Sequence, residues 1–177
     1  MGGEDPDQVD LAVVRDDASS FDDFYRAEYR ALLRLAWSLA GGRQAGEDLV
    51  QEAMLTVQRR WPVVRTYESP GGFARRVLLN SATSAARRKA AERRAMGRVR
   101  SLRVSHAIDP PPDDELWSAL RALPARQAHA VALHYVEDLP VAEIASVLGI
   151  GEGSVKVHLH RGRLALAKTL RPEDGGR

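Results

Sequence analysis

The stretch EIASVLGIGEGSVKVHLHRGR, residues 143–163, contains two apolar patterns separated by a glycine-rich break. A helix-turn-helix needs a small residue where its helices cross, a glycine at the turn, and apolar positions that hold both helices on a core. Ala145 supplies the small residue and Gly149 the turn, while Ile144 precedes them and Val155 and Leu159 anchor the second helix. The spacing predicts a helix-turn-helix, although a helical hairpin can imitate it.

The second helix of this motif has two different faces. At 100° per residue, its apolar positions fall within about 60° of one another; they are Val155, Leu159, Gly162 and Leu166. The opposite side carries polar and basic side chains around Val157. A valine suits the methyl group of thymine, and Arg161 suits guanine or a phosphate. A solvated basic face is the alternative, but it explains an exposed valine among hydrogen-bond donors poorly.

Composition limits the class of protein. The 177 residues are 44% hydrophobic and 28% charged, as expected of a soluble chain with one medium or two small domains. No apolar run approaches the roughly 20 residues of a membrane-spanning helix, and the N-terminus lacks a signal pattern. Cysteine is absent, which excludes disulfides and cysteine-ligated zinc. We expect a cytoplasmic protein without membrane insertion.

Charge is distributed unevenly along the chain. The net charge is only +2, but residues 1–28 hold nine acidic residues against two basic ones. Between Arg87 and Arg103 there are eight basic residues and one acid, Glu92. This asymmetry indicates a polyanionic partner for the body of the chain, with a solvated helix face as the alternative.

The remaining pattern predicts an all-α fold of two small helical domains joined by a flexible linker. Apolar residues recur at three- and four-residue spacing, and no useful length alternates at period two. The triple proline of SHAIDPPPDDE (105–115) cannot continue a helix. The predicted parts are a disordered acidic tail (1–19), a first domain (20–95), a linker (96–113), a second domain (114–170) and a C-terminal tail (171–177). The predicted helices are about 21–40, 45–61, 73 into the arginine-rich stretch, 114–122, 125–136, 140–148 and 153–169, with a loop at 69–72.

No motif in the sequence indicates an enzyme. The histidines lack the four-residue spacing of a helical metal pair, and no acidic cluster accompanies them. GGRQAG (41–46) lacks the lysine of a phosphate-binding loop, and no nucleophile motif is present. We therefore expect no catalytic residue, no metal, no cofactor and no small-molecule substrate.

The helix at 45–61 has a core stripe and a second, mixed face. Leu49, Val50, Ala53, Met54, Val57 and Trp61 form the stripe. The other face carries Asp48, Gln51, Glu52, Leu55 and Arg59. A leucine in a polar face can simply be exposed, or it can anchor a partner in a mixed interface. Geometry alone leaves both readings open.

These residues resemble a known family. AGEDLVQEAMLTVQRRW (45–61) and SPGGFARRVLLNSATSAARRK (69–89) resemble region 2 of the extracytoplasmic-function (ECF) sigma factors of bacterial RNA polymerase, and residues 116–170 resemble their region 4. The resemblance covers roughly residues 21–170. It implies a chain that binds core polymerase, directs promoter recognition and DNA opening, and has an anti-sigma factor as a further partner.

The resemblance also implies roles for individual residues. The mixed face, Asp48, Gln51, Glu52, Leu55 and Arg59, would dock on the clamp helices of the largest polymerase subunit, and region 4 would lie near the flap. Asn80 would face a flipped base of the −10 element, beside a pocket shaped by residues 65–72, and Arg87 and Arg88 would hold phosphates. The −35 element would be contacted by Ser154, Lys156, Val157, His160, Arg161 and Arg163.

Some positions depart from the family pattern. Ser84 stands where many members have aspartate. His160 has a shorter side chain for contacting a DNA base than arginine would have. Gly151 is a weaker helix cap than serine, and Gly162 replaces a usual alanine at up to about 1 kcal/mol in helix propensity. Two rival functions also stand beside the sigma factor: a stand-alone helix-turn-helix regulator, and a helical adaptor that binds no DNA.

Overall fold

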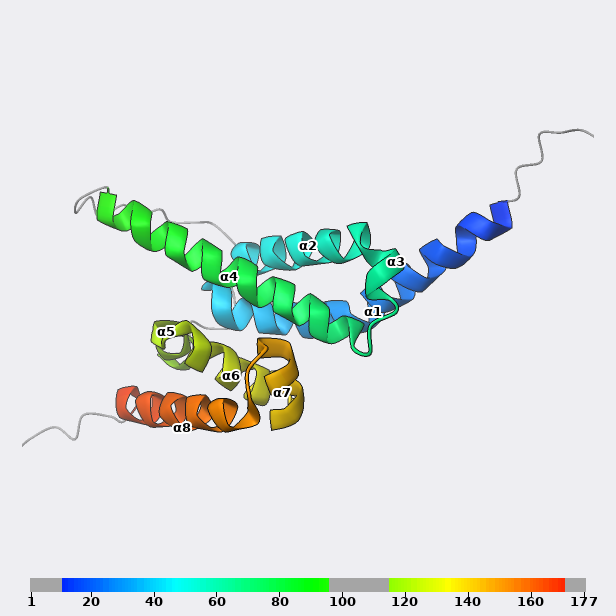
Figure 1. Cartoon of the computed structure of the whole chain (residues 1–177). Coiled ribbons are helices and arrows are strands. Elements are labelled where there is room, and N and C mark those ends of the chain that lie inside the picture. The colour runs from blue at the N-terminus through cyan, green and yellow to red at the C-terminus, as the bar shows by residue number, and fades with distance from the viewer. Residues whose placement is uncertain (1–10, 96–114, 171–177) are drawn as a thin grey trace, which may run out of the picture.

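The computed structural model describes the backbone of residues 11–95 and 115–170, and the side chains of residues 21–92 and 115–170. Within these ranges the chain is helical and has no strand, as predicted. The helices are α1 (Leu11–Ala40), α2 (Arg43–Arg59), α3 (Trp61–Val64), α4 (Pro70–Ala95), α5 (Glu115–Ala122), α6 (Ala125–Tyr135), α7 (Val141–Leu148) and α8 (Glu152–Thr169). Figure 1 shows two units, α1–α4 and α5–α8, which lie against each other.

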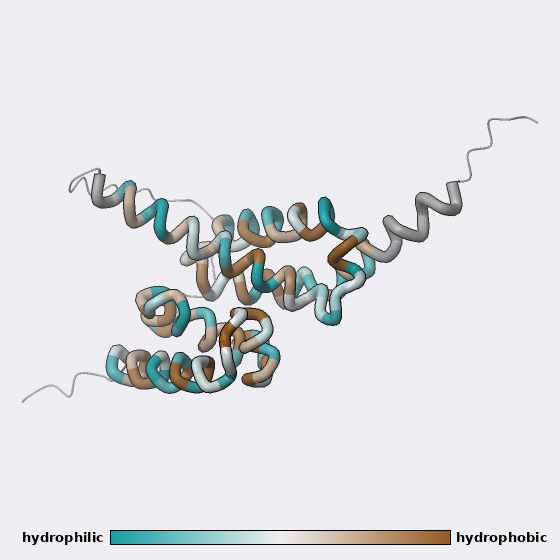
Figure 2. Tube along the Cα trace, in the orientation of Figure 1, coloured by the Kyte–Doolittle hydropathy of each residue, from teal (hydrophilic) through white to brown (hydrophobic). Residues whose placement is uncertain are grey.

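The N-terminal unit packs α1, α2 and α4 around one core. The side chains of Leu32, Leu35 and Leu78 are fully buried there. All six residues of the predicted stripe are buried as well, although Trp61 belongs to the short α3. Figure 2 shows hydrophobic and hydrophilic residues alternating along α2, as a helix with one buried face requires.

The C-terminal unit confirms its four predicted helices to within one residue at each end. Helix α8 packs on α6 and α7, and Leu133, Ile144 and Val155 are fully buried at the centre. The helix ends of this unit match the prediction more closely than those of the N-terminal unit, because glycine or proline stands at each boundary except the first.

The start of the first helix differs from the prediction. Helix α1 begins at Leu11, so the prediction of disorder is wrong for residues 11–19; residues 1–10 lie outside the described part of the chain. Starting a helix is unfavourable, but extending an existing one is easier, because each added residue gains one hydrogen bond when its backbone angles are fixed. Residues 11–20 contain no glycine or proline to stop that extension.

The loop predicted at 69–72 is also wrong, because α4 begins at Pro70. Proline suits the first helical position, since its fixed φ matches the helix and its missing N–H is not needed there. The hydroxyl of Ser69 accepts a hydrogen bond of 3.0 Å from the N–H of Gly72 and so caps the helix. The predicted linker, 96–113, and the C-terminal tail lie outside the described residues.

Gly46 allows α2 to approach α1. A β-carbon there would lie 2.4 Å from Cδ1 of Trp37 and 3.2 Å from its backbone nitrogen. We expect Gly46→Ala to lower the free energy of unfolding by about 1–3 kcal/mol through overpacking, although alanine is the better helix former. Thermal unfolding measures the change. The control is Gly153→Ala, whose β-carbon meets nothing within 4 Å; a more stable Gly46→Ala protein would contradict the packing argument.

Candidate functional site

Helices α7 and α8 form the predicted helix-turn-helix. Gly149 ends α7 in the left-handed conformation, with φ of 64°. The N–H of Ile150 then donates to the carbonyl of Ala145 over 3.1 Å, which satisfies one of the free carbonyls at the helix end. Arg126 of α6 satisfies another, at Leu148, over 3.0 Å. The turn angle is therefore fixed by local hydrogen bonds and by α6.

The two faces of α8 are as predicted. Val155, Leu159 and Gly162 are buried, and Leu166 is partly buried. All six residues predicted to contact the −35 element are exposed: Ser154, Lys156, Val157, His160, Arg161 and Arg163. Gly151 caps the helix without a side-chain hydrogen bond. An exposed apolar side chain, Val157, thus stands among donors on one continuous surface, which is the composition needed to read base edges.

Gly162 has a packing role that helix propensity does not reveal. A β-carbon at this position would lie 2.7 Å from Cγ2 of Val131 and 3.6 Å from Cδ1 of Leu123. Because Val131 is β-branched and stiff, the missing side chain is what lets α8 approach α6 closely. Glycine here therefore sets the position of the recognition helix on its support.

Asn80 and Arg87 lie on one side of α4, seven residues apart, with Ser84 between them. All three line a cavity of about 530 Å³ whose opposite wall comes from α6 and α7, including Arg126 and His129. Arg88 is exposed, as Asn80, Ser84 and Arg87 are, but it does not line this cavity. The structure thus brings two of the three predicted −10 residues together and directs them towards the C-terminal unit.

The segment before α4 lies against the same unit. Tyr67, Glu68 and Ser69 line an open groove of about 880 Å³, and Glu143 and Val147 of α7 form its other side. The segment 65–72, predicted to shape a base pocket, therefore borders a groove, and α7 forms the opposite wall of that groove.

The mixed face of α2 is exposed at all five predicted positions: Asp48, Gln51, Glu52, Leu55 and Arg59. Beside Leu55 is a small hollow of about 250 Å³, walled by Phe21, Tyr25 and Met54. Sequence reasoning missed Phe21 and Tyr25 as part of this surface, because their spacing was attributed to the core. Burial, and then the charge of Tyr29, raise the pKa of Tyr25, so its hydroxyl stays protonated at neutral pH.

His129 is a buried polar residue that the sequence did not single out as functional. Its Nε2 lies 3.4 Å from the hydroxyl of Thr83 on α4. Burial, reinforced by the nearby charge of Arg126, lowers the pKa of His129 to about 4. The imidazole is therefore neutral at physiological pH and lies where the two units meet.

This shift makes stability depend on pH. Between pH 6.5 and 4 the unfolded chain binds a proton at His129 that the folded chain does not, so stability falls as pH falls. From pH 7.5 to pH 5 the loss is about 2 kcal/mol, taking an unfolded pKa of about 6.5. Denaturant unfolding of the native protein and of His129→Gln at both pH values isolates the contribution; equal losses in the two would contradict it.

Two classes of site are not found in the part of the chain that the structure describes. No described helix is long and apolar enough to cross a membrane. In the same residues no group of three or more histidine, aspartate or glutamate side chains is arranged to hold a metal ion. The exposed polar surfaces of α2, α4 and α8 are the features that call for a functional explanation.

Comparison with protein families matches both units. The model of Sigma-70 region 2 matches residues 24–92, and that of Sigma-70 region 4 matches residues 113–166. The ECF RNA polymerase sigma factor SigM of Mycobacterium tuberculosis is 30% identical over 165 residues, covering 90% of this chain and 81% of SigM. The RNA polymerase sigma-E factor of Streptomyces avermitilis is 28% identical over 155 residues, covering 87% of each chain.

A solved structure has the same fold. The sigma factor RpoE from Bartonella quintana, crystallised in complex with the anti-sigma factor NepR, matches with a TM-score of 0.69 at 20% identity. The match covers 87% of this chain and 98% of the RpoE chain. The likeness therefore extends over both helical units.

Proposed function

The chain belongs to the ECF sigma factors of the sigma-70 family, and from this premise we propose how its exposed faces divide the work of initiation. A sigma factor binds core RNA polymerase and directs it to promoters. The observation that carries the proposal is that regions 2 and 4 both occur in order in one chain, each with an exposed face of the composition its partner needs.

Helix α2 is the proposed contact with the clamp helices of the largest polymerase subunit. Leu55 and the hollow beside it offer an apolar anchor, and Asp48, Gln51, Glu52 and Arg59 surround that anchor with polar groups. Protein interfaces commonly combine an apolar centre with a polar rim. Region 4 would meet the polymerase near its flap.

Helix α4 is the proposed reader of the −10 element. Asn80 would bind a base flipped out of the duplex, and Arg87 and Arg88 would hold the phosphates on either side. Extracting a base takes a few kcal/mol, so a hollow that already exists beside Asn80 would lower the barrier to strand opening. The groove along the segment 65–72 adjoins it, since Arg76 and Val147 line both.

Helix α8 is the proposed reader of the −35 element, through Lys156, Val157, His160 and Arg161, with Ser154 and Arg163 at its edges. Each unit alone offers DNA only a few basic side chains. Attachment of both to one polymerase makes the second DNA contact intramolecular, which raises the effective affinity without new contacts.

We further propose that the chain acts in the cytoplasm, catalyses nothing itself, and is held inactive by an anti-sigma factor. The first two points follow from its partnership with core polymerase, which supplies the chemistry. The third is supported by RpoE of the same fold, whose solved complex contains an anti-sigma factor.

Reconstitution tests the function. The full chain, core polymerase and a library of randomised promoter fragments are combined, and transcripts are sequenced. We expect initiation that depends on the chain and that selects two elements at fixed spacing. Tight sequence-specific binding by the chain without core, and no initiation with it, would favour a stand-alone regulator instead. No DNA-dependent effect at all would favour an adaptor.

A further inference from the structure

The cavity of about 530 Å³ between α4 and the helices α6 and α7 has an unbalanced charge. Three arginines line it, Arg76 and Arg87 of α4 and Arg126 of α6, and no aspartate or glutamate does. Its volume falls within the range of about 300–1,000 Å³ that is typical of sites for small molecules. The wall of this cavity therefore carries positive charge without a matching carboxylate.

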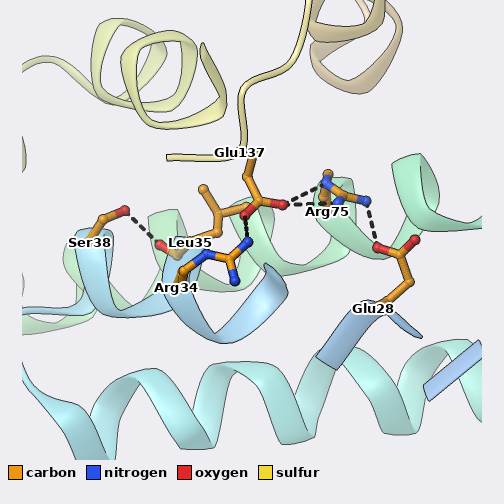
Figure 3. Close-up of polar contacts among 6 residues, drawn as sticks. All are labelled: Glu28, Arg34, Leu35, Ser38, Arg75 and Glu137. Carbon is orange, nitrogen blue, oxygen red and sulfur yellow. Dashed lines mark hydrogen bonds and ion pairs between the residues drawn. The ribbon is translucent and has the colours of Figure 1, made fainter. Parts of the chain in front are cut away.

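The neighbouring Arg75 shows how other arginines in this region are neutralised. Its guanidinium lies 2.9 Å from carboxylate oxygens of Glu28 and of Glu137, and Arg34 lies 3.9 Å from the same Glu137 (Figure 3). The side chains of Arg75 and Glu137 are only 13% and 1% exposed. Both glutamates are therefore paired with arginines outside the cavity, and neither lines it.

The three arginines of the cavity have no such partner. Among the described residues none of them forms an ion pair. Arg76 and Arg126 donate hydrogen bonds to carbonyl groups at the end of α7, but a carbonyl carries only a partial charge. Arg87 has no hydrogen bond to any described residue. An anion in the cavity would supply the charge that is missing.

The spacing along α4 places cations and neutral hydrogen-bond donors on one face. Arg76, Asn80, Thr83 and Arg87 follow one another at intervals of four, three and four residues, which is the spacing of a single helix face. All four line the cavity. Since a helix rises by 1.5 Å per residue, the two arginines stand about 16 Å apart along the axis. A ligand between them would meet amide and hydroxyl groups flanked by cations.

The opposite wall adds the start of α6. Ala125 and Arg126, the first two residues of this helix, line the cavity. Pro124 precedes them, so the helix has no side-chain cap, and its first turn has no acidic residue. Backbone N–H groups at such an end carry partial positive charge and attract anions. The helix end does not make a site by itself, but it reinforces the arginines.

The rest of the wall is suited to an organic molecule. His129 is 8% exposed and lines the cavity, and its Nε2 lies 3.4 Å from the hydroxyl of Thr83. A contact of this length is weak, so both groups can also bond to a ligand. Leu79, Val147 and Leu148 supply apolar contact area. Small-molecule sites commonly combine such an apolar wall with a few polar groups.

We propose that this cavity binds a small phosphorylated molecule, with its phosphate groups between Arg87 and Arg126. Guanidinium groups bind phosphate through paired hydrogen bonds and stay charged at physiological pH. A phosphate ester provides the negative charge for the arginines and an organic part for the apolar wall. Arg126 and His129 have no part in the proposed DNA contacts, so the ligand gives the opposite wall a function of its own.

Calorimetric titration of the full chain tests the site, with inorganic pyrophosphate as the probe and the ionic strength held constant by sodium chloride. The native chain is compared with Arg87→Gln, Arg126→Gln and the control Arg88→Gln. Arg88 is exposed on the same helix and has the same charge as Arg87, but it does not line the cavity. Circular dichroism checks that each variant is folded.

We expect one pyrophosphate to bind per chain. Arg87→Gln and Arg126→Gln should each lower the affinity at least about tenfold, as the loss of a hydrogen bond between charged groups predicts. Arg88→Gln should stay within about twofold of the native affinity, because salt screens an exposed charge outside the site. Absence of saturable binding, or an equal loss in Arg88→Gln, would overturn the site.

A second series replaces pyrophosphate by ADP and distinguishes an organic ligand from an inorganic one. We expect ADP to bind at least as tightly as pyrophosphate, because the cavity offers apolar side chains beside its arginines. Failure of ADP to displace bound pyrophosphate would overturn the organic part of the proposal and identify the ligand as inorganic phosphate.

The ligand would also compete with promoter DNA, a consequence that rests on the proposed function. Asn80 and Arg87 line the cavity and are the proposed −10 contacts. Pyrophosphate at about ten times its dissociation constant should weaken binding of a single-stranded −10 oligonucleotide, selected by reconstitution, by about tenfold. Binding of a −35 duplex should be unchanged. Pyrophosphate that binds without weakening −10 binding would support the ligand site and overturn the assignment of Asn80 and Arg87 to the −10 element.

Discussion

Leu55→Asp lowers the affinity for core RNA polymerase by at least about 100-fold, the largest effect that we expect from a single substitution. Leu55 is 50% exposed in the free chain, so the aspartate is tolerated by the fold. On docking, however, the carboxylate would enter an apolar contact without a partner, and burying an unpaired charge is highly unfavourable. Truncation of a central apolar anchor alone can remove a few kcal/mol of binding energy. Titration of labelled core polymerase measures the change.

The matched control is Val63→Asp on α3. Val63 is 53% exposed and belongs to the same unit, but it does not line the hollow beside Leu55. We expect its affinity for core polymerase to stay within about twofold of the native value, and both variants to keep the native melting temperature. If Leu55→Asp is folded and binds core polymerase normally, the α2 face is not the docking surface.

Arg161→Ala reduces binding to the −35 element by about 10- to 100-fold, as expected from the loss of a side chain that contacts a base edge, which is worth about 1–3 kcal/mol. Arg161 is exposed on the outer face of α8 while Leu159 and Gly162 beside it are buried. The core of the C-terminal unit is therefore untouched. Fluorescence anisotropy with a −35 duplex at fixed salt measures the affinity, and a mismatched duplex measures the specificity.

Lys168→Ala is the control for this effect. Lys168 is exposed in the last turn of the same helix, outside the proposed reading surface. Its substitution by alanine removes the same positive charge as Arg161→Ala does. A weak loss that is equal for matched and mismatched DNA is expected there, because a distant positive charge contributes only to non-specific attraction. Loss of core binding by Arg161→Ala would show that the division of labour between α2 and α8 is wrong.

Periodicity predicted most of the helices because it is a local property. The stripe of α2 and the two faces of α8 were readable from residue spacing alone, and the structure buries the stripe and exposes the face as predicted. Residue spacing did not predict the starts of α1 and α4 correctly. Glycine at 71 and 72 was interpreted as a loop, although Ser69 and Pro70 together form a good helix start. The acidic residues after Leu11 were interpreted as disorder, although they extend a helix.

Some of the exposed functional positions could be recognised in the sequence, and others only in the structure. Val157 and Leu55 were visible in the sequence as apolar residues within polar faces, and the structure exposes both. Phe21 and Tyr25 were not recognised as part of the α2 surface, since a helical spacing of aromatic residues is the same for a core and for the wall of a hollow. Only packing distinguishes these two cases.

By itself the sequence determined the helix-turn-helix, the two-unit all-helical organisation and the family resemblance, because all three depend on residues close together in the chain. The tertiary structure decided what depends on distant residues. Gly162 became a contact site for Val131 rather than a weak helix former. Glu137, an unremarkable acid in a turn, became the centre of an ion cluster with Arg75, 62 residues away. Charge pairing across such a separation leaves no periodic trace, so it appears only when the helices are packed.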